Sequence, residues 1–337
     1  MKIGAYSYAY STNLGDEIQT LAATQHLPRV DVLLERDRLY RYSECEPTFV
    51  ISNGWFTEQS SWPPPDSIVP LFVSFHPARP DLLVTEKYTS YFKKHEPIGC
   101  RSTESVEAFR KIGIDAYFSG CLTLTLQRRP VPQTDRIYAV DVDPELLSAV
   151  VPKEIQKKIV HITHEFPSQQ TTMMTRVKWN AAYYGLRGIQ KWDLGQPVLG
   201  GLVGKLNKRR HTFRTQRAED LLRMYSGAKL VITPRLHCAM PCLALGTPVI
   251  LLKPDIDADP RFGGLRDFVR THSDATKPIQ INWENPEPNS GAHLPYAKAL
   301  RERCQEAVHR ILAEEQSEYR PAGESRVAGK PLSTLSE

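Results

Sequence analysis

The sequence predicts an α/β fold of two Rossmann-like halves, each a parallel sheet flanked by helices. Short β-branched runs alternate with helical stretches, which is typical of βαβ units around a parallel sheet. A segment rich in arginine and proline, 128–132, interrupts this alternation and is the best linker candidate. The length of 337 residues is enough for two domains with their own cores. We therefore expect one domain over 1–130 and a second over 131–290.

The elements of the first half follow from short apolar runs and the turn signals between them. Asn53-Gly54 and His76-Pro77 predict the ends of two strands. Gly113 stands where glycine commonly ends a helix. The expected strands are 2–6, 30–34, 48–52, 71–75 and 98–101, followed by a stretch over 115–126, and the expected helices are 15–26, 85–94 and 103–112.

The second half repeats the pattern and ends in a long helix. That helix, over 293–315, is expected to pack back on the first domain as a separate segment, 291–317. Residues 318–337 have no apolar period and predict a disordered tail. The expected strands are 137–142, 159–163, 229–233 and 249–252, and the expected helices are 144–150, 173–184, 218–227 and 236–245.

One stretch, 168–212, fits this pattern poorly. It contains several glycines and leads into a basic run from Lys205 to Arg217. Beyond the helix over 173–184 we expect a long loop over 185–212, and loops of this length are usually functional or disordered. The basic run is either a solvated face or a contact with a phosphorylated acceptor or an anionic membrane surface. The sequence leaves both open.

Composition excludes several classes of protein and cofactor. Hydrophobic residues at 41% and charged residues at 24% exclude collagen, a disordered chain and a long coiled coil. The net charge of +5 suits an acidic ligand but is too small for a dedicated nucleic-acid binder. The N-terminus lacks the apolar core of a signal peptide, so we expect a cytoplasmic protein. The six scattered cysteines predict reduced thiols, and His237-Cys238 with Cys242 lacks a fourth ligand, so we expect no metal.

The first cluster of unusual polar residues follows the strand over 2–6. In an open parallel sheet, ligands bind beyond the carboxyl ends of the strands, where helices begin. Asn13-Leu14-Gly15-Asp16 stands at such a place, and Gly15 would let the backbone approach a ligand closely. Asp16 either caps the helix or faces a cleft as a carboxylate able to take a proton from a hydroxyl. Spacing alone favours capping.

The second cluster follows the strand over 229–233. Arg235 and His237 both lie at the start of the next helix, behind Pro234. The helix dipole disfavours cations at this end unless an anion is bound there. The cluster therefore predicts a phosphate or carboxylate ligand, and the alternative is that both residues pair with a neighbouring acid.

Three other residues follow strands directly. Arg101 precedes Ser102 or Thr103 as the N-cap of the next helix, and its guanidinium suits a carboxylate ligand or a glutamate of the first turn. His76 and His164 are minor candidates, because a lone histidine is more often structural.

Two segments resemble a known family. Residues 230–239 (LVITPRLHCA) and 245–250 (LGTPVI) are similar to the signature of the polysaccharide pyruvyl transferase family. Asn13-x-Gly15-Asp16, Arg101-Ser102 with Ser105, and Asp259-Pro260-Arg261-Phe262 resemble its shorter motifs. The resemblance extends from Met1 to about Asp267.

This resemblance implies two Rossmann-type domains in a GT-B-like arrangement with the active site in the interdomain cleft. The first domain would hold the acceptor and the second the donor. The implied reaction moves a pyruvyl group from phosphoenolpyruvate to a sugar of a polysaccharide or glycan precursor, as a ketal, with no cofactor besides this donor. The residues expected to act are His237 and Asp16 in catalysis, and Arg101, Arg235, Asn13, Gly15, His164 and Arg261 in substrate binding.

The implied partners are phosphoenolpyruvate and a saccharide acceptor, and the sequence does not decide whether a lipid carries that acceptor. A lipid carrier would place the protein in peripheral contact with the inner face of the membrane. The alternative enzyme is a GT-B glycosyltransferase that uses a nucleotide sugar, because its second domain binds a diphosphate at a similar helix start. A non-enzymatic alternative is a carbohydrate- or phosphate-binding protein.

Overall fold

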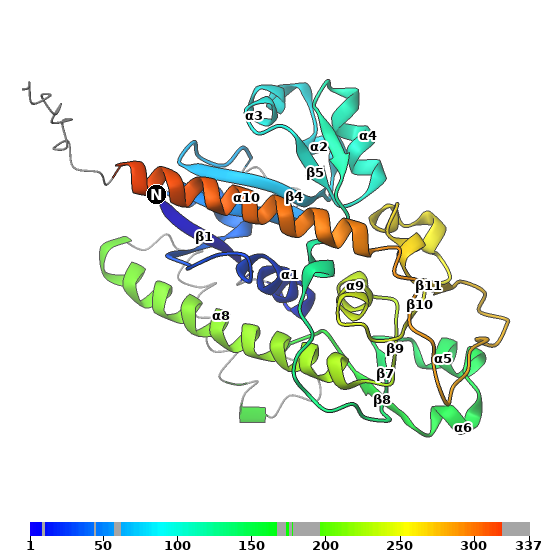
Figure 1. The fold of residues 1–337 in the computed structure, drawn as a ribbon. Coiled ribbons are helices and arrows are strands. Elements are labelled where there is room, and N and C mark those ends of the chain that lie inside the picture. The colour runs from blue at the N-terminus through cyan, green and yellow to red at the C-terminus, as the bar shows by residue number, and fades with distance from the viewer. Residues whose placement is uncertain are drawn as a thin grey trace, which may run out of the picture.

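A computed structural model describes residues 1–8, 11–43, 45–56, 62–166, 173–174, 177 and 196–318, and these form two parallel sheets (Figure 1). The first sheet has the strand order β2-β1-β3-β4-β5-β6, and the second has the order β11-β10-β9-β7-β8. Every neighbouring pair of strands is parallel. The expected α/β class with two Rossmann-like sheets is confirmed, whereas the domain boundaries at 130 and 290 stay predictions.

The first sheet consists of β1 (Lys2–Ser7), β2 (Val32–Glu35), β3 (Thr48–Phe56), β4 (Ile68–Pro77), β5 (Ile98–Cys100) and β6 (Ala116–Phe118). The second consists of β7 (Ile137–Val140), β8 (Ile159–Ile162), β9 (Leu230–Thr233), β10 (Val249–Leu252) and β11 (Arg270–His272). The α-helices are α1 (Leu14–Thr24), α2 (Pro80–Leu83), α3 (Thr89–Lys93), α4 (Thr103–Lys111), α5 (Pro144–Val150), α6 (Lys153–Gln156), α8 (Gln196–Gly227), α9 (Leu236–Ala244) and α10 (Leu294–Glu318). Short 3-10 turns include η3 (Leu122–Thr125) and η5 (Pro260–Phe262).

The predicted ends of two strands in the first sheet are wrong. β3 runs through Asn53-Gly54 to Phe56, with an irregularity in its register between Ser52 and Gly54. Gly54 has φ +93°, and a Cβ atom there would lie 2.1 Å from Oε1 of Gln19 on α1. Glycine at this position therefore marks a bulge inside the strand rather than a turn after it. β4 likewise continues through His76 to Pro77.

The prediction of a loop up to residue 212 is also wrong. One helix, α8, covers Gln196–Gly227, where only 218–227 was expected to be helical. The glycines at 200, 201 and 204 suggest a loop, but the buried residues Arg210 and Arg214 continue the stripe of Ala218, Leu221 and Tyr225 toward the N-terminus at helical spacing. The expected helix over 173–184 falls largely outside the described residues, as do the expected loop up to 195 and the tail from 319.

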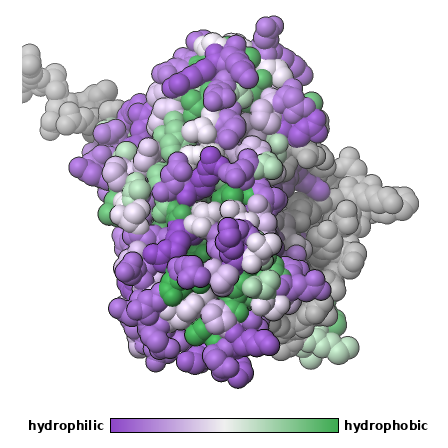
Figure 2. All heavy atoms as spheres, turned by 90° about the vertical axis from the view of Figure 1, so that its right-hand side faces the viewer, coloured by the Kyte–Doolittle hydropathy of each residue, from purple (hydrophilic) through white to green (hydrophobic). Residues whose placement is uncertain are grey.

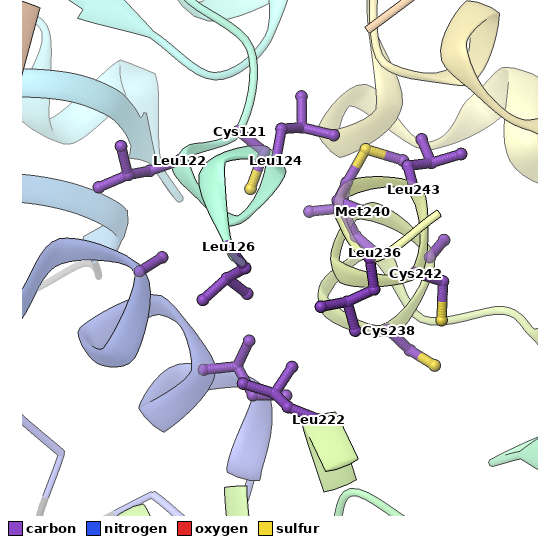
Figure 3. Packing of buried hydrophobic residues seen from close by; sticks show 14 of the residues in the cluster. Cys121, Leu122, Leu124, Leu126, Leu222, Leu236, Cys238, Met240, Cys242 and Leu243 are labelled. Carbon is purple, nitrogen blue, oxygen red and sulfur yellow. The ribbon is translucent and has the colours of Figure 1, made fainter. Parts of the chain in front are cut away.

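A single hydrophobic core joins the two sheets. It includes Ile51 and Val73 from the first sheet, Val231 and Leu251 from the second, and residues of α1, α9 and α10. The turn η3 lies at its centre. In Figure 3, Leu124 and Leu126 lie on the side of η3 that faces α9, opposite Leu236 and Met240, whereas Leu122 points away from α9. Because this core is shared, the two sheets are held in a defined relation to each other.

Helix α10 packs against the first half of the chain. It contacts η3 and strand β4, and Figure 1 shows it lying across the first sheet. In the part of the chain that the structure describes, no helix is long and apolar enough to cross a membrane. The face drawn in Figure 2 is mainly hydrophilic, with hydrophobic residues in small groups.

Candidate functional site

A pocket of about 570 Å³ lies where the carboxyl ends of strands from both sheets meet. Seven of the eight residues expected to act line it, and only Gly15 does not. Its volume is in the range of small-molecule sites. The expected residues in its wall are Asn13, Asp16, Arg101, His164, Arg235, His237 and Arg261.

The start of α1 contributes two of these residues, but not in the way the spacing suggests. Asn13, not Asp16, is the N-cap, and its Oδ1 atom accepts a hydrogen bond from Gly15 N at 3.0 Å. Asp16 is buried in the first turn, and its carboxylate accepts hydrogen bonds from Ser11 Oγ at 2.5 Å and Gln19 Nε2 at 3.3 Å. The capping interpretation of Asp16 is therefore wrong. The carboxylate belongs to the pocket wall.

Gly15 serves packing rather than ligand approach. A Cβ atom at this position would lie 3.1 Å from the Cβ atom of His237 and 3.1 Å from Oδ1 of Asn13. Glycine thus lets the first turn of α1 come close to the start of α9. This approach brings a residue after a strand of the first sheet beside a residue after a strand of the second.

Arg101 is the most unusual group in the pocket. It follows β5, ahead of the N-cap Ser102, and only 1% of the residue is exposed. Its Nε atom is buried without a hydrogen-bond partner, and no carboxylate among the described residues forms an ion pair with it. Burial lowers the pKa of Arg101 to about 10. A buried guanidinium without a counter-ion is costly, so this group needs an anion.

His237 is the neighbour of this guanidinium. Arg101 Nη1 donates a hydrogen bond of 3.2 Å to His237 Nε2. Because arginine is always a donor, this Nε2 atom carries no proton and the imidazole is neutral. Burial and the Arg101 charge hold the pKa of His237 well below its ordinary value. Without a ligand, His237 is therefore a neutral imidazole beside a cation.

Arg235, the N-cap of α9, pairs with an acid, which confirms for this residue the alternative that the sequence left open. Its Nε atom lies 2.9 Å from Oδ2 of Asp141, which follows β7. The Asp141 carboxylate also accepts hydrogen bonds from Thr163 Oγ1 at 2.5 Å and from His164 N at 3.0 Å. Asp141 has φ +53°, a left-handed conformation that is costly for a residue with a Cβ atom. The carboxylate of this one residue thus holds the ends of β7 and β8 and the start of α9 together.

His164 follows β8 and is fully buried. Its Nε2 atom and the Tyr225 hydroxyl share a hydrogen bond of 2.7 Å, and its carbonyl accepts one from Leu14 N at 2.8 Å. Its Nδ1 atom has no hydrogen-bond partner among the described residues. Buried polar atoms rarely stay unpaired, so this nitrogen is a candidate ligand contact.

Two further cations, Arg261 and Lys253, form another part of the pocket wall. Arg261, on η5, is 45% exposed in its side chain and is bound through two nitrogen atoms to Asp259. Lys253 follows β10, and its Nζ atom lies 2.8 Å from Asp255 and 3.3 Å from Asp259. Hydrogen bonding to Asp259 raises the pKa of Arg261. Both cations therefore already have carboxylate partners.

Two residues beyond the predicted strand ends complete the wall. Trp55 lies at the end of β3, and Nη1 of Arg36 donates a hydrogen bond of 2.7 Å to its carbonyl. Arg36 also pairs with Asp37 at 3.0 Å. Trp55 was missed because its strand was expected to end at residue 52. Arg36, Asp141 and Lys253, by contrast, stand at or near the ends of expected strands and could have been found by the rule that found Arg235.

The pocket wall contains five cations and two carboxylates, Asp16 and Asp141. Of the five cations that line it, four have a carboxylate partner, and Arg101 alone among them has none in the described part of the chain. The described residues contain no group of three or more histidine, cysteine or acidic side chains placed to hold a metal ion. The arrangement can therefore bind an anion at Arg101, beside an imidazole and across from the Asp16 carboxylate.

Comparison with known proteins gives one family. A family model described as polysaccharide pyruvyl transferase matches residues 13–255 of the chain. The matched segment contains Asn13, Arg101 and His237, and it ends before Arg261. No curated protein matches the chain.

Proposed function

The chain belongs to the polysaccharide pyruvyl transferase family, and we propose that it moves a pyruvyl group from phosphoenolpyruvate to a saccharide as a ketal. The observation that carries this proposal is the buried guanidinium of Arg101, which has no ion-pair partner among the described residues and is hydrogen-bonded to His237, in a pocket whose other cations each have a carboxylate partner. Phosphoenolpyruvate carries a carboxylate and a phosphate, and it would supply the missing negative charge.

The donor would be held between the two halves. Arg101 would bind one anionic group, and the terminal nitrogen atoms of Arg235 would bind the other, since Asp141 engages its Nε atom. His164 Nδ1 and Arg261 would add contacts at the wall, and no cofactor besides the donor is needed. In a GT-B-like arrangement, the donor site would thus lie between the halves, with Arg101 from the first and Arg235 from the second, and the acceptor would lie beside Asp16 of the first half.

His237 would become an acid only when the donor is present. Its pKa is low because of burial and the Arg101 charge. The negative charges of phosphoenolpyruvate would oppose the Arg101 charge, so donor binding would raise the pKa of His237 and protonate it. His237 would then deliver a proton to the methylene carbon of the donor or to the phosphate as it leaves.

The reaction proceeds in two bond-forming steps. Protonation of the methylene carbon leaves an oxocarbenium-like centre at the neighbouring carbon, and one sugar hydroxyl attacks that centre. A second hydroxyl of the sugar then forms the second C–O bond as the C–O bond to phosphate breaks, and its proton leaves with the phosphate. Asp16 lines the pocket and would accept a hydroxyl proton or orient the acceptor, with Asn13 beside it.

The first experiment measures phosphate release from phosphoenolpyruvate with a panel of free and lipid-linked glycans. The wild-type protein should release phosphate with at least one acceptor, and His237→Gln should lower the rate by about 100-fold or more. His309→Gln, on the exposed face of α10, is the matched control and should keep the wild-type rate.

A binding measurement separates this proposal from a nucleotide-sugar enzyme. Phosphoenolpyruvate should raise the melting temperature of the wild-type protein, and UDP should not. Stabilisation by UDP alone, or full activity of His237→Gln, would overturn the proposed function.

A further inference from the structure

A fully buried ion pair joins helix α1 to helix α8, outside the pocket. Arg214 Nε donates a hydrogen bond of 2.8 Å to Oε1 of Glu17, and the two side chains are 0% and 1% exposed. His211, one turn before Arg214, lies 3.4 Å from the other oxygen of Glu17. Despite the opposing effect of burial, these two partners hold the pKa of Glu17 below its ordinary value. The carboxylate is therefore charged at neutral pH.

The remaining nitrogen atoms of Arg214 bind the turn that precedes α1. Nη1 donates to Ser11 O, and Nη2 donates to Asn13 O at 3.0 Å. Ser11 Oγ in turn donates to the Asp16 carboxylate at 2.5 Å. A planar guanidinium can hold a carboxylate and two carbonyls at once, whereas a lysine ammonium is a single point charge. Arg214 is thus two contacts away from the Asp16 carboxylate.

The helix that carries Arg214 belongs to the second half of the chain. α8 lies between β8 and β9 in sequence, and it packs beside α1 of the first half (Figure 1). After β9 the chain reaches Arg235 and His237 at the start of α9. The same helix therefore fixes the Ser11–Asn13 turn and leads to the residues proposed to hold the donor.

We propose that Arg214 is a positioning residue that sets the Asp16 carboxylate against the donor site. The proposal rests on the function given above, in which Asp16 acts on the acceptor hydroxyls. It also assigns a role to one residue of the basic run 205–217, for which the sequence suggested solvent, a phosphate or a membrane. Arg214 faces the protein interior and binds the chain's own backbone.

The test uses kinetics per functional site. The double variant Glu17→Gln/Arg214→Met removes both charges together, so no unpaired buried carboxylate is left. The variant Arg214→Lys keeps the positive charge but loses the planar guanidinium that binds several groups at once. Both variants should lose kcat by about 10- to 100-fold, because small misplacements of catalytic groups have effects of this size. KM for phosphoenolpyruvate should stay within twofold, since Arg101 and Arg235 are untouched. Rates are normalised to phosphoenolpyruvate sites counted by calorimetry, so loss of folded protein does not imitate the effect.

Arg217→Ala is the matched control, one turn further along the exposed face of α8, and should retain the wild-type kcat. Amide hydrogen exchange over residues 11–17 should be faster in the two Arg214 variants and unchanged in Arg217→Ala. A wild-type protein with no phosphate release would overturn the proposed function. An active wild type whose Arg214 variants keep kcat per site within twofold would overturn the positioning role alone.

Discussion

Two arginines that line the same pocket, Arg101 and Arg235, have opposite surroundings. Arg101 follows a strand of the first sheet, is buried, and has no acid partner among the described residues. Arg235 follows a strand of the second sheet, has a side chain that is 33% exposed, and is paired with Asp141. The Arg235 guanidinium is held in place by Asp141 of the protein itself. The Arg101 guanidinium lacks a negative partner among the described residues, and a ligand would supply it. The first half of the chain therefore carries the stronger requirement for an anion.

The largest expected effect separates these two arginines by binding and by stability. Arg101→Met should weaken phosphoenolpyruvate binding by about 100-fold or more, because a desolvated charge contact is lost. Since burial lowers the pKa of Arg101 to about 10, its charge opposes folding at neutral pH. The same substitution should therefore raise the free energy of unfolding by about 1–3 kcal/mol. Calorimetry and urea unfolding measure the two quantities, and a less stable variant would contradict the assignment.

Arg235→Met should have the opposite effect on stability and a smaller one on binding. The loss of its ion pair leaves Asp141 with only the Thr163 and His164 hydrogen bonds, so the free energy of unfolding should fall by about 1 kcal/mol. Binding of phosphoenolpyruvate should weaken by about 10-fold, because Arg235 is partly solvated. Equal binding losses in Arg101→Met and Arg235→Met would break the comparison.

The Arg101 charge also predicts how stability depends on pH. Burial and Arg101 lower the pKa of His76 to about 2, and His237 is lowered in the same way. Below pH 6.5 the unfolded chain binds protons that these folded histidines do not. Lowering the pH below 6.5 should therefore lower the free energy of unfolding, by up to about 1.4 kcal/mol per pH unit for each histidine. Urea unfolding of His76→Gln at pH 6, 5 and 4 should show a slope lower by about 1 kcal/mol per pH unit than wild type.

The smallest effect is expected on the exposed face of α8. Arg217 pairs with Asp220 at 3.0 Å, but their side chains are 49% and 38% exposed. Surface pairs of this kind contribute little, so Arg217→Ala should change the free energy of unfolding by less than about 0.5 kcal/mol. A change above about 1 kcal/mol in thermal or urea unfolding would mean that this face has a partner.

Strand-end residues were the most predictable part of the site. Arg101, Arg235 and His237 follow apolar runs directly, and the rule that parallel strands place ligands at their carboxyl ends brings them together. Trp55 was missed because Gly54 suggests a turn, whereas this glycine lies inside the strand, where the Gln19 side chain of α1 leaves no room for a Cβ atom. Local sequence carries no sign of that contact.

The partners of the charged residues were not predictable. Asp141 lies 94 positions before Arg235, and Glu17 lies 197 before Arg214, so neither pair has a sequence signal. The sequence left open whether the basic run is solvated or contacts a phosphate or a membrane, because the glycines before it, at 200, 201 and 204, hide the helical period. Only the packing of α8 on α1 shows that Arg214 faces inward.

Because α8 of the second half packs on α1 of the first half, it limits which chimeras of two relatives are stable. Consider a chimera that joins the first half of one relative to the second half of another at the 128–132 linker. It would take Glu17 from one parent and Arg214 from the other. A mismatched partner would leave a buried charge unpaired, at a cost of about 3–5 kcal/mol. Acceptor specificity is therefore best exchanged by loops of the first half alone, with the Ser11–Asn13 turn, Glu17 and α8 kept from a single parent.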